Sequence, residues 1–451
     1  MISVNPENGQ VIGEYPPITM AAVKDILTEM DEDRQLRSMP YSERAGLMER
    51  LAQLLEQDAQ ELSVLMALEM GKPVGQGVQE IKKSALVCRY YAERAETFLA
   101  ARPCETEASQ SEVVFEPLGL ILAVMPWNFP FWQVFRCLAP LMMAGNSIAL
   151  KHASNVQACA GAIEELVHRA GFPSSSFRNL QVGSDMVERI IGLSEVKAVT
   201  LTGSTPAGRA VASSAGRALK KAVLELGGSD PYLILEDADL DLAVREAAFA
   251  RLLNSGQSCI AAKRLIVARP IADEFVERLI LEMNRYSVGS PLDEGTQIGP
   301  MARIDLRDEL HSQLVRACRE GAQVAGGGYL PDGAGAFYPP TVLTDVKKGN
   351  TAATEELFGP IAAVMVAGDE EEAVAIANES EFGLGASIYS QNLERARKLA
   401  DRIDAGSCFV NAFVRSDPRL PFGGIKGSGY GRELSDFGIL EFVNIKTIFV
   451  G

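Results

Sequence analysis

Short apolar runs alternate with amphipathic segments along residues 118–228. The apolar runs predict strands at Leu120–Met125, Ser147–Leu150, Asn179–Val182, Val196–Leu201 and Ala222–Leu226. The amphipathic segments predict helices at Val156–Ala170, Asp185–Ile191 and Pro206–Leu219. Apolar strands that alternate with helices are typical of a parallel sheet covered on both faces. We therefore expect an α/β fold with a doubly wound sheet, an architecture that binds nucleotides at the carboxyl ends of its strands.

A second α/β series follows Gly227 and Gly228. Its expected strands are Tyr232–Leu235, Leu265–Val267, Ile361–Val366, Ala386–Tyr389 and Ser407–Val410. Its expected helices are Ala272–Asn284, Glu370–Asn378 and Leu393–Ile403. The repeated alternation predicts a second doubly wound domain, with a domain boundary near Gly228.

The two ends of the chain add different elements. Apolar residues at helical spacing predict helices over Tyr41–Asp58, Glu61–Met70 and Ile81–Leu99. The polar stretch Pro103–Glu116 then leaves the core, and the alternating segment Glu441–Val450 predicts a strand that could pair with it. The uncharged stretch Pro117–Phe135 is interrupted by prolines, so it predicts a buried strand followed by a loop and no membrane span.

Composition narrows the class of protein. The 451 residues are 47% apolar, enough for a large core, and 43 Lys and Arg against 59 Asp and Glu give a net charge of −16. Because nucleic-acid binding needs a basic surface, we expect no DNA or RNA partner. Only three histidines are present, so most zinc sites lack ligands and no metal is expected. Seven scattered cysteines, an odd number, indicate the reducing cytoplasm.

The segment Gly203–Gly208 is a candidate phosphate-binding turn. It has the glycine spacing of a P-loop, but Arg209 and Ala210 stand where that motif has its lysine and hydroxyl residue. It follows a predicted strand and has Pro206 in a first helical turn, which would aim free N–H groups at a pyrophosphate. The alternative is an ordinary strand–helix turn. A second glycine cluster, Gly427–Gly431, follows no predicted strand and predicts a loop with positive φ angles.

Three residues are candidates for catalysis. Cys259 ends a polar turn, so its thiolate could be a nucleophile; the alternative is a small core residue. Glu225 interrupts an apolar strand, where burial would raise its pKa toward the range of a general base; alternatively it points outward at the strand end. Asn128 lies between two prolines and could donate to an oxyanion; alternatively it bonds its own turn.

Seven motifs in register resemble the aldehyde dehydrogenase superfamily over almost the whole chain. They are Pro126-Trp-Asn-Phe-Pro130, Lys151-His-Ala-Ser154, Leu201-Thr-Gly-Ser-Thr205, Leu224-Glu-Leu-Gly-Gly228, Gly256-Gln-Ser-Cys259, Glu355-Glu-Leu-Phe-Gly-Pro360 and Pro421-Phe-Gly-Gly-Ile-Lys426. Glu225 and Cys259 are 34 positions apart, the usual spacing in that family. Within the family, the chain most resembles the short bacterial succinate-semialdehyde dehydrogenases.

The resemblance implies oxidation of an aldehyde with NAD or NADP. Cys259 would attack the carbonyl, Asn128 would hold the oxyanion, and Glu225 would activate the water that hydrolyses the thioester. The implied cofactor site consists of Trp127, Lys151, Ser154, Gly203, Ser204, Leu226, Glu356 and Phe358. Ser154 replaces a glutamate that repels the 2′-phosphate in many NAD-preferring relatives, so NADP should be accepted.

The resemblance also implies a division of the chain. Residues 1–102 and 118–228 would form a Rossmann-like cofactor-binding domain, and residues 229–424 a catalytic domain. Residues 103–117 and 440–451 would form a small β arm for oligomerisation, because their strand edges would be exposed in a monomer. The expected assembly is a homodimer or a homotetramer.

Arg136 and Ser416 match a carboxylate-binding arginine and a nearby serine of relatives specific for succinic semialdehyde. We therefore expect both to bind the substrate's carboxylate. The alternative is that Arg136, which lies in an apolar segment, reaches the surface or pairs with an acid. A second arginine of some relatives is replaced by Leu253, which leaves glutaric semialdehyde or a medium-chain aldehyde as alternative substrates. Residues that could compensate for it are Arg251, Arg415 and Arg419.

Functions of other kinds remain open. A cysteine hydrolase would use the same thiolate and amide without a nucleotide, but it would need a base for Cys259, usually a histidine. A non-catalytic protein on a dehydrogenase fold would be free to lose the three catalytic candidates, and all are present. Within the family, an enzyme that passes the thioester to coenzyme A or phosphate is the nearest rival, and Glu225 favours water as the acceptor.

Overall fold

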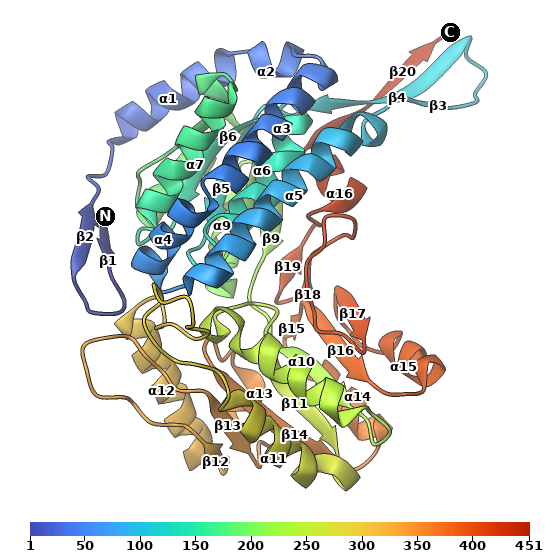
Figure 1. The fold of residues 1–451 in the computed structure, drawn as a ribbon. Helices are drawn as coiled ribbons and strands as arrows, with labels where there is room; N and C mark the ends of the chain where they lie inside the picture. Colours follow the sequence, from blue (N-terminus) through green and yellow to red (C-terminus); the bar gives the residue numbers. More distant parts are fainter.

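The computed structural model describes residues 1–451, and two largely parallel sheets organise them (Figure 1). One sheet lies in the upper part of Figure 1 and the other in the lower part. The chain leaves the first sheet after Glu225 and enters the second at Asp230. Two doubly wound sheets in one α/β chain confirm the expected fold class.

The first sheet has six strands in the order β19-β9-β8-β5-β6-β7. Its strands are β5 (Leu120–Met125), β6 (Ser147–His152), β7 (Phe177–Asn179), β8 (Val196–Thr202), β9 (Lys221–Glu225) and β19 (Gly429–Tyr430). Every pair is parallel except β19 with β9. The strand order reverses between β5 and β8, and doubly wound sheets bind ligands at the carboxyl ends beside such a reversal.

Helices cover both faces of this sheet. Because successive strand residues point to opposite faces, Ile121 and Ala123 pack on one side, and Leu120 and Leu122 on the other. The first face packs against α3 (Tyr41–Gln57), α4 (Ala59–Met70), α5 (Val74–Phe98), α6 (Trp132–Met143) and α7 (Gln157–Ala170). The second face packs against α1 (Met20–Glu32), α8 (Val187–Ile191) and α9 (Thr205–Arg217). Burial on both sides explains why the strands are continuous apolar runs.

The second sheet has seven strands in the order β12-β13-β14-β11-β10-β16-β17, all parallel except β12. They are β10 (Asp230–Ile234), β11 (Ala262–Ala268), β12 (Gln323–Gly326), β13 (Thr341–Thr344), β14 (Ile361–Ala367), β16 (Gly385–Tyr389) and β17 (Ser407–Val410). One face packs against α10 (Leu240–Leu252) and α11 (Ala272–Met283). The other packs against α12 (Ile304–Arg319), α14 (Glu370–Asn378) and α15 (Leu393–Ala400).

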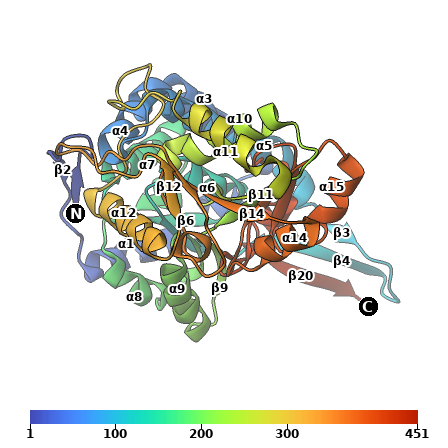
Figure 2. The same ribbon diagram turned by 90° about the horizontal axis from the view of Figure 1, so that it is seen from below.

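A three-stranded arm projects from the body of the molecule in both views (Figures 1 and 2). Its central strand β4 (Gln110–Pro117) is antiparallel to β3 (Arg102–Pro103) and to β20 (Val443–Val450). The expected pairing of the polar excursion with the C-terminal strand is therefore confirmed. The remaining short elements are β1 (Ile2–Val4), β2 (Val11–Glu14), α2 (Gln35–Ser38), α13 (Thr351–Thr354), β15 (Phe382–Gly383), β18 (Ile425–Lys426) and α16 (Ser435–Leu440).

Some local predictions were wrong. Helix α6 starts at Trp132, where a loop was expected, because all of its residues are buried and it has no exposed face to mark a surface helix. The Gly427–Gly431 cluster follows strand β18 and contains β19, although Gly429 and Gly431 do have positive φ angles of 110° and 82°. Strand β7 ends at Asn179, where the predicted strand began. Among the helices, none combines the length and the apolar run that a bilayer crossing requires.

Candidate active site

Four candidate residues lie at the carboxyl edge of the first sheet. Asn128 follows β5, Lys151 is near the end of β6, Ser204 follows β8, and Glu225 ends β9. Because these strands are parallel neighbours, their carboxyl ends meet at one edge. The N–H of Gly203 donates to the Glu225 carbonyl oxygen at 2.9 Å, which ties the turn after β8 to the end of β9.

The Glu225 side chain points into the protein and not into solvent. It is 2% exposed, and neither carboxyl oxygen has a hydrogen-bond partner. Burial raises the pKa of Glu225 to about 8, and the attraction of Arg136 opposes the shift while the Glu433 carboxyl group adds to it. The pKa direction expected for a carboxyl group in a buried strand is confirmed. A group that titrates near neutral pH can accept a proton from water.

Arg136, on α6, is part of a buried ion pair. Its Nε pairs with the Glu433 carboxylate, and its Nη2 donates to Thr202 Oγ1 at 3.2 Å. The guanidinium lies 4.8 Å from the centroid of the Phe422 ring, and the side chain is 3% exposed. The acid pairing that the sequence left open as an alternative is therefore present, and Arg136 is not a free cation.

The turn that carries Asn128 is fixed on both sides. Gln133 Nε2 donates to Asn128 Oδ1 at 3.0 Å, which directs the NH₂ group of Asn128 away from Gln133. That NH₂ group donates to the Gln257 carbonyl oxygen at 3.1 Å. Lys72 Nζ donates to the Asn128 carbonyl oxygen at 3.0 Å and pairs with Glu80. Glu80 in turn accepts from two backbone N–H groups at the start of α6. The amide thus faces the segment that leads to the candidate nucleophile.

Cys259 follows a turn that a buried arginine holds together. The φ angles across Asn254–Gly256 are 56°, 54° and 75°, and the left-handed region costs non-glycine residues roughly 1 kcal/mol each. A Cβ at Gly256 would lie 2.4 Å from the Gly359 carbonyl carbon, so this approach requires glycine. Arg251 Nη2 donates to the carbonyl oxygens of Gly256 and Gly359 at 2.5 and 2.7 Å. Arg251 is therefore committed to the backbone and does not replace the missing substrate arginine.

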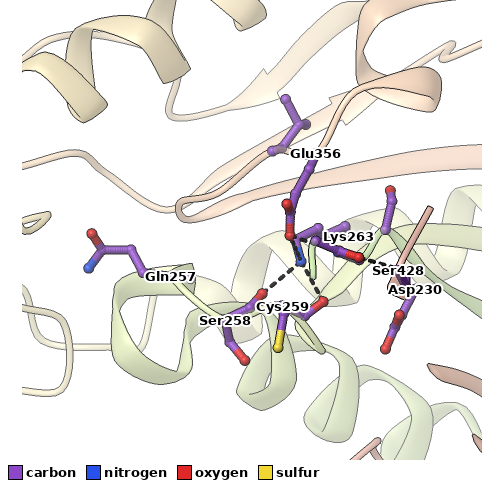
Figure 3. Close-up of polar contacts among 12 residues, drawn as sticks. Asp230, Gln257, Ser258, Cys259, Lys263, Glu356 and Ser428 are labelled. Carbon is purple, nitrogen blue, oxygen red and sulfur yellow. Dashed lines mark hydrogen bonds and ion pairs between the residues drawn. The ribbon is translucent and has the colours of Figure 1, made fainter. Parts of the chain in front are cut away.

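Lys263 connects the Cys259 loop to Glu356 (Figure 3). Its Nζ donates to the carbonyl oxygens of Ser258 and Cys259 at 2.7 and 2.8 Å, and it pairs with Glu356 Oε1 at 2.9 Å. The N–H of Gly228 donates to the same Glu356 oxygen at 3.1 Å. Figure 3 shows the Cys259 sulfur on the other side of its loop from the ammonium. These contacts join the end of the first sheet to the start of the second.

The surroundings of Cys259 favour the uncharged thiol. Burial raises its pKa to about 12, while Lys263 and Arg136 oppose that shift. Because a thiolate and not a thiol is nucleophilic, attack on a carbonyl requires a further change in charge or solvation at this site. The lower thiol pKa expected with cofactor bound stays a prediction.

The start of α9 has the features of a phosphate-binding site. Ser204 is the N-cap of this 13-residue helix and its side chain accepts a backbone N–H at 3.4 Å. Pro206 follows in the first turn, as expected. A Cβ at Gly208 would lie 2.5 Å from the Leu226 side chain, so glycine lets the helix pack directly on Leu226. The free N–H groups of the first turn lie beside the carboxyl end of β8.

Other residues of the implied cofactor site have suitable chemistry. Lys151 is 9% exposed, and desolvation lowers its pKa while Asp185 opposes the shift. Ser154, three residues on, is exposed. The rings of Trp127 and Phe358 meet edge to face with centroids 5.8 Å apart. A buried cation, a helix N-terminus, an aromatic pair and the Glu356 carboxylate fit a dinucleotide.

Ser416 contacts a lysine that the sequence patterns did not single out. Ser416 is 7% exposed, and its hydroxyl oxygen accepts a hydrogen bond from Lys83 Nζ at 2.8 Å. Arg419 pairs with Asp417 at 2.6 Å, so it is committed to that acid. The Arg415 guanidinium lies 5.5 Å from the centroid of the Phe413 ring. Lys83 is therefore the cation in direct contact with Ser416.

Several polar and charged residues of the site were missed, and the sequence signal that could have revealed them differs from one to the next. Lys263 and Arg264 interrupt the apolar run Ala261–Val267, which is the signal that singled out Glu225, so Lys263 could have been found. Lys83 lies in a helix beside the exposed Lys82, and helical period alone does not separate the two. The other missed residues are Lys72, Glu80, Gln133 and Glu433.

Doubly wound sheets with a phosphate-binding turn define a nucleotide-binding protein. Residues 1–448 match the aldehyde dehydrogenase family, and the chain belongs to this family. It is 47% identical over 449 residues to a probable NADP(+) succinate-semialdehyde dehydrogenase of Synechocystis sp., with 99% of each chain covered. It is 44% identical over 452 residues to an NAD(P)+ succinate semialdehyde dehydrogenase of Escherichia coli, covering 99% of this chain and 97% of the other.

A solved structure extends the similarity to three dimensions. The succinic semialdehyde dehydrogenase from Streptococcus pyogenes, in complex with NADP+, matches this fold with a TM-score of 0.97 and 36% identity. The match covers 100% of this chain and 99% of that one. The family implied by the seven sequence motifs is thereby confirmed.

Proposed function

We propose that this chain oxidises succinic semialdehyde to succinate with NADP, and also accepts NAD. The observation that carries the proposal is the meeting of Cys259 with the end of the Glu225 strand. A Cβ at Gly228, three residues after Glu225, would lie 2.5 Å from the Cys259 carbonyl oxygen. We therefore place the Cys259 thiol and the buried Glu225 carboxyl group in one active site. The names of the relatives from Synechocystis and Escherichia coli support the substrate and the cofactor.

The proposed chemistry divides between three residues. The Cys259 thiolate attacks the aldehyde carbon, and the new oxyanion accepts hydrogen bonds from the Asn128 amide and the Cys259 N–H. When bound, the oxidised nicotinamide supplies the hydride acceptor that converts this thiohemiacetal into a thioester. Glu225 takes a proton from water, and the water oxygen bonds to the acyl carbon as the C–S bond breaks. The carboxylic acid leaves and Cys259 is restored.

The cofactor is proposed to lie along the carboxyl edge of the first sheet. The N–H groups at the start of α9, with Gly203 and Ser204, suit the pyrophosphate, and Glu356 suits the nicotinamide ribose. Lys151 and the neutral Ser154 leave room and positive charge for a 2′-phosphate. Leu226, Trp127 and Phe358 supply the apolar and aromatic walls.

A panel of substrates with each cofactor tests the function. Succinic semialdehyde, glutaric semialdehyde, butanal and benzaldehyde would be compared by the absorbance of the reduced nicotinamide. We expect kcat/KM for succinic semialdehyde to exceed that for butanal at least about 10-fold, the effect of one charge-assisted contact. Equal values would leave an aldehyde dehydrogenase of another substrate. Hydrolysis of an ester without any aldehyde oxidation would favour the cysteine hydrolase instead.

We also propose that the arm joins copies of this chain into a homodimer or a homotetramer. The arm leaves the body, and strand β20 exposes Ile445, Phe449 and Val450 by 64%, 53% and 46%. Exposed apolar residues on an extended strand edge favour association. Light scattering should report more than one chain, and replacing Ile445 and Phe449 with serine should shift the mass toward the monomer. A monomer in the unaltered protein at micromolar concentration would contradict this.

The proposed division of labour follows the two sheets. The half built on the first sheet, residues 1–102 and 118–228, would bind the cofactor, and residues 229–424 would carry the thiol. All seven cysteines are free, which supports a reducing compartment such as the cytoplasm.

A further inference from the structure

Lys83 is a partly buried ammonium without a carboxylate partner. It lies on α5, donates to Ser416 Oγ at 2.8 Å and lies 4.2 Å from the centroid of the Trp132 ring. A hydroxyl group and an aromatic ring stabilise a cation without neutralising it. Removing an ammonium from water is costly unless an anion accompanies it. The position is therefore suited to an anionic ligand.

The acids nearest to Lys83 already have other partners. Glu80 on the same helix and Asp417 in the loop after Ser416 attract its charge. Glu80, however, forms the buried ion pair with Lys72, and Asp417 pairs with Arg419 at 2.6 Å. The protein itself therefore leaves the ammonium incompletely compensated.

The cations nearest to Lys83 increase this imbalance. Arg136 on α6 and Arg415 in the loop both repel the ammonium. Arg136 has Glu433 as a partner, whereas Lys83 has only neutral groups. Lys83 has donors left for a ligand, because an ammonium has three N–H donors and one of them bonds to Ser416.

We propose that Lys83, together with Ser416, binds the carboxylate of the substrate. This inference rests on the proposed function and names the group that selects short aldehydes with a terminal carboxylate. One N–H of the ammonium keeps its bond to Ser416, and the others donate to the carboxylate. Arg136, although paired with Glu433, adds to the positive electrostatic potential near Lys83. The Trp132 ring covers the ammonium and limits competition from water.

The charge of Lys83 makes the selectivity depend on pH. Burial lowers the pKa of Lys83 to about 8, with repulsion from Arg136 adding to the effect. Below that pH the side chain is charged and attracts the carboxylate, and above it the attraction is lost. The ratio of kcat/KM for succinic semialdehyde to that for butanal should therefore fall as the pH rises through about 8. The ratio cancels the titration of Cys259, which both substrates need.

Two variants and a control test this assignment. Lys83→Met should lower the ratio by about 10- to 100-fold, mainly through the KM of succinic semialdehyde, which is the range for a charge-assisted hydrogen bond. Lys83→Arg should keep most of the selectivity and remove the dependence on pH between about pH 7 and pH 9, because arginine does not titrate there. Lys82→Met, on the exposed neighbour, should leave the ratio and its pH profile as they are.

The outcomes separate this inference from the proposed function. A protein that shows no preference for succinic semialdehyde over butanal refutes the proposed function. A protein that shows the preference but keeps it in Lys83→Met refutes the role of Lys83. Equal losses for both substrates mean that Lys83 supports the fold, which also overturns the assignment. If Lys83→Met does not fold, the pH dependence of the unaltered protein still decides, since a flat ratio contradicts the proposal.

Discussion

The two sheets present their site residues at opposite ends of their strands. In the first sheet, Asn128, Lys151 and Glu225 lie at or just beyond the carboxyl ends. In the second, Cys259 and Glu356 lie just before the amino ends of β11 and β14. The reason is the short crossing between the sheets: four residues, 226–229, separate β9 from β10. The carboxyl edge of one sheet therefore faces the amino edge of the other.

Because of this difference, different groups supply the positive charge at the two edges. At the first edge, helix α9 directs its N-terminus at the site, which suits an anionic cofactor without any special side chain. At the second edge, carbonyl oxygens of the Cys259 turn gather instead, and buried cations bind them: Arg251 and Lys263. At the first edge the phosphate-binding part is positioned by regular backbone and the Asn128 turn by side chains, whereas the whole Cys259 turn at the second edge depends on individual side chains.

The largest expected effect comes from removing the nucleophile at the second edge. Cys259→Ala should lower aldehyde oxidation by at least about 10⁴-fold, because no other group can form the thioester. Binding of NADP, measured by calorimetry, should persist because the first edge is intact. Substantial turnover in this variant would refute the proposed mechanism, and loss of cofactor binding would show that the two edges are not separable.

A smaller effect is expected at the end of β9. Glu225→Gln should lower kcat by about 10²- to 10⁴-fold by slowing hydrolysis of the thioester. A single burst of reduced cofactor should survive in stopped-flow absorbance. With a pKa of about 8, the unaltered carboxyl group is protonated at low pH and cannot accept a proton, so the hydrolysis rate should rise as the pH passes through 8. Disappearance of the burst would give Glu225 a different role.

Lys263 tests the dependence of the second edge on side chains. Lys263→Met removes the cation that most lowers the thiol pKa, so alkylation of Cys259 by iodoacetamide at a fixed pH should slow by about 10-fold, one pKa unit. Lys263→Arg should restore part of the rate. Lys348, whose side chain is 80% exposed, provides a matched Lys→Met control. An unchanged alkylation profile would mean that Lys263 only holds the loop in place.

The smallest effect is expected at the cofactor site of the first edge, where backbone N–H groups at the start of α9 contribute most of the proposed binding. Ser154→Glu places a negative charge near the expected 2′-phosphate without touching the start of α9. The ratio of kcat/KM for NADP to that for NAD should fall by roughly 3- to 10-fold, the scale of a partly screened charge repulsion. If the ratio of kcat/KM for NADP to that for NAD does not change, the 2′-phosphate of NADP binds elsewhere.

Local pattern was enough to predict much of the fold and only part of the site. Strand β5 and helix α14 were predicted to the residue, because a turn signal bounds each, β5 is a continuous apolar run and α14 has a helical period. Helix α6 was missed because a fully buried helix has no exposed face that would mark it in the sequence. Glu225 stood out as a charge in an apolar strand. The contact of Lys83 with Ser416 joins positions 333 residues apart, and no local pattern encodes it.

The chain is made in an order that delays completion of its first sheet. Strand β9 receives its outer neighbour β19 only after 204 more residues have been added, and β4 waits still longer for β20. At synthesis rates of about 5–20 residues per second, the β9 edge stays unpaired for roughly 10–40 s on the ribosome. An open strand edge invites pairing with other nascent chains. Newly made copies are therefore most vulnerable to aggregation before the last two dozen or so residues emerge, and a ribosome-associated chaperone would matter most in that interval.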